Sequence, residues 1–253
     1  MSTTLEDHAL LRSRPVRRPW FYTGASVLIT IIVLAGFGPA LYESLVLGVP
    51  RHWAIHVHAA VFLGWLALLI GQTVLAASGQ VALHRRVGNL GIAYGIAVVI
   101  LGLVAGFVVP ATYVKAGTWP LDRAASFLAT IFGDMVLFGG FFGAAIAYRG
   151  RPELHKRLML LAAIALILPG VARLWFIEAM FAGGVSARVL GVLVFAWLVP
   201  LLVAMAYDLA TARRIHPVYW IGAVISVASI GRFPLAQTDL WRGFGRAVLA
   251  PLL

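Results

Sequence analysis

Seven long stretches of the chain contain almost no Asp, Glu, Lys or Arg, and this feature limits the possible folds more than any other. A helix needs about 20 consecutive apolar residues to cross the hydrocarbon core of a bilayer. The stretches comprise residues 19–42, 52–84 (apolar centre 54–77), 87–110, 124–148, 158–178, 189–207 and 215–231. Glycine and proline within them do not argue against helix, because membrane helices tolerate both. The pattern predicts an all-α, polytopic membrane protein built as a bundle of seven transmembrane helices.

Composition supports this prediction. Of 253 residues, 62% are hydrophobic and only 11% are charged, whereas about a quarter of the residues in soluble domains are charged. The net charge of +11 lies in short clusters between the apolar runs, which is typical of topology signals and argues against nucleic-acid binding. The chain has no cysteine, which excludes disulfides, iron–sulfur clusters and Cys-bound zinc.

The distribution of Lys and Arg predicts the orientation. Twelve of them fall in the N-terminal tail and in alternate loops, seven fall on the other side, and Arg173 lies within a span. Because cytoplasmic loops carry the excess of positive charge, we expect a cytoplasmic N-terminus and an external C-terminus. The chain then divides into a basic tail (1–19), a transmembrane domain (20–235) and an outer segment (236–253). We expect this outer segment to lie along the surface as a short amphipathic segment or to be partly disordered.

Six of the seven histidines form two groups. Three lie at the predicted cytoplasmic ends of helices and three at the outer end of the second helix: His84, His155 and His216, and His52, His56 and His58. One cluster on each membrane face is what a transmembrane electron carrier needs. The alternative is that histidine, half polar and half apolar, simply suits an interface.

The second helix carries a polar stripe. His58, Trp65 and Gln72 are spaced by seven residues, so they share one helix face, with Gln72 about 21 Å deeper than His58. His56 points to the opposite side. The stripe is either a seam between helices or the wall of a ligand site, and in both cases we expect it to face the bundle interior.

His52 and His56 form an i, i+4 pair near Glu43, a spacing that can bind a metal ion. The loop offers no obvious third ligand, so we predict no metal site there.

Two charged residues fall within spans. Arg173 lies 18 residues after His155, so on a continuous helix both share one face, with Arg173 about 27 Å further out. A buried arginine costs about 3 kcal/mol unless it is paired, so Arg173 is either functional or extends to the outer interface near Glu178. Asp134 lies near the middle of the fourth helix without an obvious partner, where it is expected to be protonated or hydrogen-bonded to a neighbouring helix.

The ordered set of these residues resembles a bacterial family of predicted membrane proteins of unknown function. Members show His, Trp and Gln on one helix, then His-Arg-x-x-Gly, then His-Lys/Arg-Arg-x-Met, then a later Arg. In this chain the matching residues are His58, Trp65, Gln72, His84, Arg85, Gly88, His155, Arg157, Met159 and Arg173. The resemblance is close over residues 52–175 and looser over 20–235, and it implies a multi-pass protein of the bacterial cytoplasmic (inner) membrane.

The layout is also distantly similar to the ascorbate-reducible di-haem b-type cytochromes. That family ligates one haem between the second and fourth helices and another between the third and fifth. His84 and His155 occupy the third and fifth helices, so the resemblance implies one haem b there. The fourth helix has no histidine, so the resemblance does not extend to a second haem at His58.

Three functional hypotheses follow. The first is an electron-transfer protein with a cytoplasmic-side haem held by His84 and His155, with Arg85 and Arg157 binding its propionates. A quinone would then use the outer region around His58, Gln72 and Arg173. The second is a non-enzymatic subunit or assembly factor that contacts lipid and other membrane subunits, and the third is a small-anion carrier that uses Arg173. The sequence contains no recognisable catalytic triad, Walker loop or dinucleotide motif.

Overall fold

A computed structural model describes residues 20–181 and 186–253, and within these ranges all regular structure is helical. Seven of the helical segments are long and apolar enough to cross a membrane, which confirms the predicted fold class. They are Phe21–Leu45, Trp53–Ala77, Val81–Lys115, Leu121–Ala147, Pro152–Ala172, Arg188–Ala212 and Pro217–Leu235. Several extend beyond the charge-poor runs, because a helix continues past the hydrocarbon core into the polar interface.

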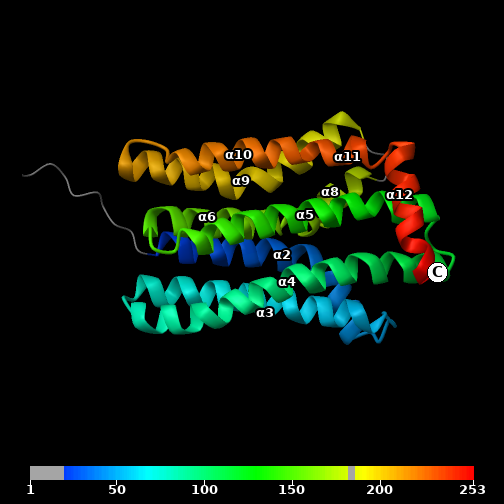
Figure 1. Cartoon of the computed structure of the whole chain (residues 1–253), viewed down its shortest axis with the longest axis horizontal. Coiled ribbons are helices and arrows are strands. Elements are labelled where there is room, and N and C mark those ends of the chain that lie inside the picture. Colours follow the sequence, from blue (N-terminus) through cyan, green and yellow to red (C-terminus); the bar gives the residue numbers. More distant parts are fainter. Residues whose placement is uncertain (1–19, 182–185) are drawn as a thin grey trace, which may run out of the picture.

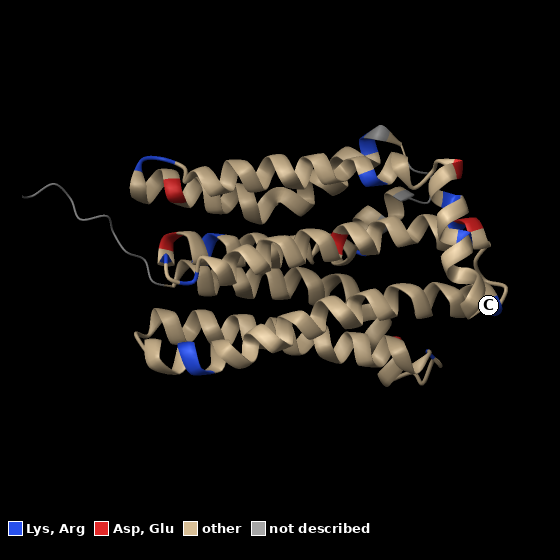
Figure 2. Cartoon of the chain, in the orientation of Figure 1, with Lys and Arg blue, Asp and Glu red and all other residues tan. Residues whose placement is uncertain are grey.

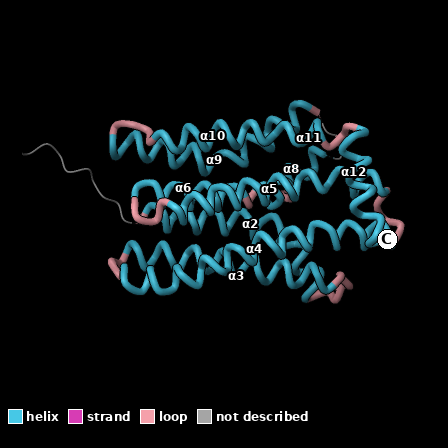
Figure 3. The backbone as a smooth tube through the Cα atoms, viewed as in Figure 1, coloured by secondary structure: helices cyan, strands magenta, loops and turns pink. Residues whose placement is uncertain are grey.

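The helices lie side by side with short connections at the two ends of the bundle (Figure 1, Figure 3). In chain order they are α2 (Phe21–Leu45), α3 (Trp53–Ala77), α4 (Val81–Lys115), α5 (Leu121–Ala147), α6 (Pro152–Ala165), α7 (Leu168–Ala172), α8 (Trp175–Phe181), α9 (Ala187–Ala212), α10 (Pro217–Ala228), α11 (Arg232–Leu235) and α12 (Asp239–Leu249). Short 3-10 turns cover Ser229–Gly231 and Ala250–Leu252. Most charged residues gather toward the two ends of the bundle (Figure 2).

The sides of the bundle are apolar. Large hydrophobic side chains such as Leu90, Val136 and Val224 are exposed along the middle of their helices. A soluble protein does not leave such continuous apolar surface in water, whereas acyl chains cover it without penalty. The protein is therefore an integral membrane protein in contact with the bilayer.

Glycine allows α4 and α5 to approach closely. A Cβ atom added to Gly95 would lie 2.3 Å from the Phe142 ring, and one added to Gly102 would lie 2.4 Å from Met135 Sδ. Small residues at such seams let backbones pack tightly where no hydrophobic effect drives association. This packing fixes α4, which carries His84, against α5, whose Ala145 carbonyl contacts His155.

The fifth span is broken, contrary to the continuous helix that we expected. It consists of α6 and α7, with the short helix α8 following them, and the first break precedes Pro169. Proline has no N–H and its ring clashes with the carbonyl four residues earlier, here that of Ala165, the last residue of α6. The assumption that His155 and Arg173 share one helix face is therefore wrong.

The C-terminal segment (236–253) forms the helix α12, which crosses one end of the bundle (Figure 1). Trp241 Nε1 donates to the Ala125 carbonyl (3.0 Å), and Arg246 pairs with Asp122 (2.8 Å), both on α5. Leu240 remains 83% exposed, on a different side of α12 from Arg246. The segment is thus ordered as an amphipathic helix.

The orientation remains a prediction that cysteine labelling can test. Because the chain has no cysteine, single cysteines at positions 152 and 250 give clean reporters at opposite ends of the bundle. We expect a membrane-impermeant maleimide, applied to intact cells, to label position 250 and to leave position 152 unlabelled until the membrane is permeabilised. Labelling of both positions from the same side would contradict the seven-span topology.

Candidate functional site

The structure brings His84 and His155 together across the bundle. Their ring centroids lie 6.3 Å apart and the ring planes are nearly perpendicular, at 80°. His84 projects from the first turn of α4 and His155 from the first turn of α6. Because both helices begin at the same end of the bundle, the two first turns lie at similar depth (Figure 1).

A backbone carbonyl holds each ring through Nδ1. His84 Nδ1 lies 3.2 Å from the Gln72 carbonyl near the end of α3, and His155 Nδ1 lies 2.8 Å from the Ala145 carbonyl near the end of α5. Carbonyls accept only, so each Nδ1 carries the proton and each Nε2 has a free lone pair. Neither Nε2 has a hydrogen-bond partner among the described residues.

The side-chain amide of Gln72 lies beside this histidine pair. Its Nε2 and Oε1 are both buried and have no hydrogen-bond partner in the described part of the chain. A Cβ atom added to Gly88, one turn after His84, would lie 3.7 Å from Oε1, so the amide faces α4. A buried amide without partners costs about 1–3 kcal/mol, which a ligand with polar groups would offset.

The stripe on α3 faces the interior, as expected. Trp65 is only 2% exposed, and its ring packs edge-on against Phe138 and Phe142 of α5. Its Nε1, like Nδ1 of His58, is buried without a partner among the described residues. His56 is exposed.

Gln72 lies at a different depth from His58 and Arg173, with which it was grouped from the sequence. The Gln72 backbone carbonyl contacts His84, whereas His58 lies about 21 Å further along α3, toward the end of the bundle where Arg173 follows α7. Arg173 donates from Nη1 to the Pro169 carbonyl (2.8 Å), and its guanidinium lies 4.7 Å from the centre of the Phe37 ring. Helix rise explains the separation, since fourteen residues on α3 cover most of the membrane.

Arg85 and Arg157, both expected to bind propionates, differ in their surroundings. Arg85 is exposed next to His84, and none of its contacts within the described ranges is an ion pair. Arg157 lies two residues after His155, hence on another side of α6, and is buried. Its guanidinium forms two hydrogen bonds with Asp208, from Nε (2.9 Å) and from Nη2 (2.6 Å).

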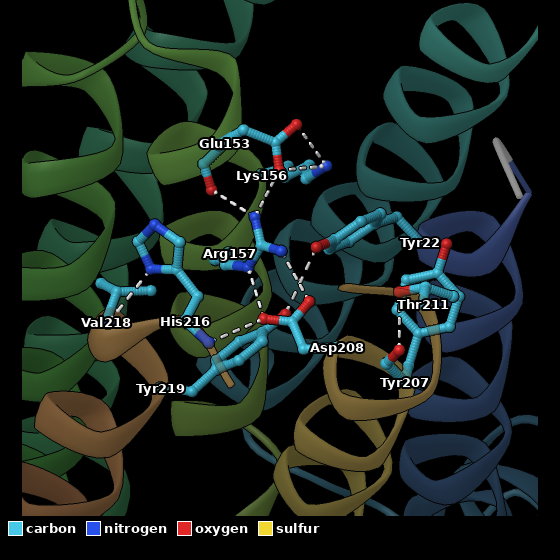
Figure 4. Close-up of polar contacts among 10 residues, drawn as sticks. All are labelled: Tyr22, Glu153, Lys156, Arg157, Tyr207, Asp208, Thr211, His216, Val218 and Tyr219. Carbon is cyan, nitrogen blue, oxygen red and sulfur yellow. Dashed lines mark hydrogen bonds and ion pairs between the residues drawn. The ribbon is translucent and has the colours of Figure 1, made fainter. Parts of the chain in front are cut away.

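Arg157 is the centre of a polar cluster between α6, α9 and α10 that the sequence analysis missed (Figure 4). Nη1 donates to the backbone carbonyl and the carboxylate of Glu153, at 2.9 and 2.6 Å. Asp208 also accepts the backbone N–H of His216 (3.1 Å), which joins α9 to α10. Nearby, the hydroxyls of Tyr22 and Tyr219 lie 3.4 Å apart.

His216 is a neutral member of this cluster. Burial lowers the pKa of its imidazole below the usual range, and the positive charge of Arg157 lowers it further. The ring therefore stays neutral at pH 7, and its Nδ1 accepts the backbone N–H of Val218 (3.2 Å) at the start of α10. His216 acts as a helix cap and lies apart from the histidine pair.

Asp134 is hydrogen-bonded to a neighbouring helix, which is one of the two outcomes that we expected, although the sequence did not indicate its partner. Arg232 donates from Nη2 to Asp134 Oδ1 (2.7 Å), and these residues are 8% and 2% exposed. The seventh span continues through Ser229–Gly231 into α11, which carries Arg232 far enough along α5 to meet the carboxylate. The other oxygen, Oδ2, has no partner in the described ranges.

His52 and the nearby Glu43 form contacts with residues close to them in the sequence. His52 caps α3, because its Nδ1 accepts the Ala54 N–H (3.3 Å), and Glu43 pairs with Arg51 (2.8 Å). Within the described residues, no group of three or more His, Cys, Asp or Glu side chains is arranged to hold a metal ion.

Comparisons with known protein families, with curated proteins and with solved structures give no match to this chain. The function is therefore inferred from the residues and geometry of the site.

Proposed function

We propose that the protein is a membrane electron-transfer protein in which His84 and His155 would hold one b-type haem. The observation that carries this proposal is the pairing of the two rings at 6.3 Å, with a backbone carbonyl on each Nδ1. Two imidazoles alone rarely hold a small metal ion, which takes at least three protein ligands. Haem supplies four ring nitrogens of its own, so two histidines complete its coordination.

The spacing of the rings fits this assignment. A metal–imidazole bond of about 2 Å on each side, with roughly 1.1 Å from each ring nitrogen to its ring centre, gives centroids about 6 Å apart. The short distance between the two rings does not come from a hydrogen bond between them. Both Nδ1 atoms already donate to backbone carbonyls, and neither Nε2 carries a proton to donate. These carbonyl bonds fix the tautomer and the rotation of each ring and make Nε2 a better ligand.

Neighbouring residues would complete the site. Arg85, exposed beside His84, is the guanidinium available for a propionate, whereas Arg157 is engaged by Asp208 and Glu153. The Gln72 amide supplies a donor and an acceptor inside the site. A haem with two imidazole ligands supplies one-electron transfer without an open position on the iron. A membrane quinone is the partner we propose.

The colour of the purified protein tests the proposal. We expect protein from haem-replete cells to show a Soret band and sharp α and β bands on dithionite reduction, with about one haem per chain by the pyridine haemochrome assay. A colourless protein would refute the haem site and favour the alternative of a non-enzymatic membrane subunit or assembly factor.

Gln72→Leu offers a second test with two opposite effects. Without haem, the leucine removes two buried polar atoms that have no partner, so we expect haem-free protein to unfold at a higher temperature, by the equivalent of about 1–3 kcal/mol. With haem, we expect a lower haem-to-protein ratio, because the amide no longer contacts the ligand. Gln80→Leu, an exposed glutamine in the α3–α4 connection, is the matched control and should change neither quantity. A lower unfolding temperature of haem-free Gln72→Leu would show that the amide is already satisfied.

A further inference from the structure

A polar cleft of about 380 Å³ lies at the end of the bundle opposite the histidine pair. It opens between the first turns of α5 and the start of α12. Its lining residues are Pro120, Asp122, Arg123, Ser126, Gln237 and Arg242.

The cleft is positively charged. Its two guanidinium groups belong to Arg123 and Arg242, and its single carboxylate, that of Asp122, is paired with Arg246 outside the lining (2.8 Å). Arg242 donates from Nη2 to Gln237 Oε1 (2.5 Å). Its Nε is buried and has no partner among the described residues, so it is a donor available to an anion.

Surrounding side chains place the cleft at the membrane interface. Trp119 stacks on Tyr113 (4.9 Å between ring centroids), and Arg123 lies 4.4 Å from the centre of the Trp119 ring. Tryptophan and tyrosine concentrate at the depth of lipid head groups. The exposed Leu240 and Phe244 of α12 give that helix an apolar face suited to the same depth.

We infer that this cleft binds the phosphodiester head group of an anionic phospholipid. Arg123 and Arg242 contact the phosphate. A phosphate oxygen accepts a hydrogen bond from the Nε of Arg242, which has no partner among the described residues. The acyl chains extend from the cleft into the bilayer beside the bundle. The site is separate from the histidine pair, so the lipid proposal does not depend on whether the protein binds haem.

Lipid titration tests the inference. The full-length protein in an uncharged detergent is titrated with phosphatidylglycerol, phosphatidylcholine or inorganic phosphate, and bound lipid is counted by native mass spectrometry. We expect one phosphatidylglycerol to remain bound at concentrations where phosphatidylcholine does not, and Arg123→Gln/Arg242→Gln to weaken that binding about tenfold or more. Arg242→Gln alone, which leaves the Arg123–Trp119 contact intact, should weaken it to a smaller extent.

Lys115→Gln is the matched control, since this exposed cation lies at the same end of the bundle outside the cleft. Its binding of phosphatidylglycerol should equal that of the unmodified protein. Three results would overturn the inference: equal retention of the two lipids, undiminished retention by the double variant, or displacement of the lipid by millimolar inorganic phosphate, which would identify a free-anion site.

Discussion

His84→Ala and His155→Ala should each abolish the haem spectrum of the purified protein. Each substitution removes one of the two imidazoles that would hold the haem and leaves a single imidazole for the iron. Loss even of a group that only orients a metal ligand costs 10- to 100-fold in affinity, so we expect the haem-to-protein ratio to fall by more than about tenfold. Absorbance at the Soret maximum relative to protein concentration measures this ratio.

Two further variants distinguish ligation from a general structural effect. His56→Ala changes an exposed histidine on α3 and should leave the spectrum unchanged. His84→Met keeps an axial ligand but exchanges imidazole for thioether, which raises the reduction potential of a haem iron. We expect this variant to retain haem with a higher midpoint potential.

Gel filtration in detergent supplies the control for folding. The alanine variants should elute as the unmodified protein does, because both side chains are only half-buried and each makes a single hydrogen bond to a backbone carbonyl. An unchanged spectrum in either alanine variant would exclude that histidine as a ligand, even if the protein contains haem.

Sequence was a good guide to the spans because hydropathy is a local property. Each span needs its own run of apolar residues, whatever the other helices do. The predicted ends of the helices were less accurate. For α4, the charge-poor run begins at residue 87 but the helix begins at Val81. Polar residues such as His84 extend a helix beyond the bilayer core without adding to its hydropathy. The sequence could not anticipate the break before Arg173, since transmembrane helices often accommodate proline without ending.

Contacts between side chains of different helices were predictable only where the two residues had to lie at the same depth in the membrane. His84 and His155 each follow the start of a helix at the same end of the bundle, so a shared depth could be inferred from the topology. Arg157 and Asp208 are 51 residues apart, and Asp134 and Arg232 are 98 apart. No periodicity connects residues on different helices, and the rotation of each helix about its axis depends on packing. The buried ion pairs could therefore be found only in three dimensions.

Asp208→Ala should be the most destabilising of the substitutions considered. The carboxylate is 1% exposed and accepts hydrogen bonds from Arg157 Nε, Arg157 Nη2 and the backbone N–H of His216. Its removal leaves the buried guanidinium with the exposed Glu153 as its only counter-ion among the described residues. Breaking one side of a buried ion pair costs about 3–5 kcal/mol, because the remaining charge loses its partner without regaining water. We expect a large drop in the thermal unfolding midpoint in detergent.

A second pair of variants separates the cost of an uncompensated charge from the value of the pair itself. Arg157→Met/Asp208→Leu replaces both ions with apolar side chains, and such replacements are often neutral or stabilising. We therefore expect the double variant to unfold well above Asp208→Ala. Glu43→Ala removes the carboxylate of the exposed Arg51–Glu43 pair and should cost at most about 1 kcal/mol. A double variant as unstable as Asp208→Ala would mean instead that the hydrogen bonds of Asp208 to α6 and α10 are themselves required to hold these helices together.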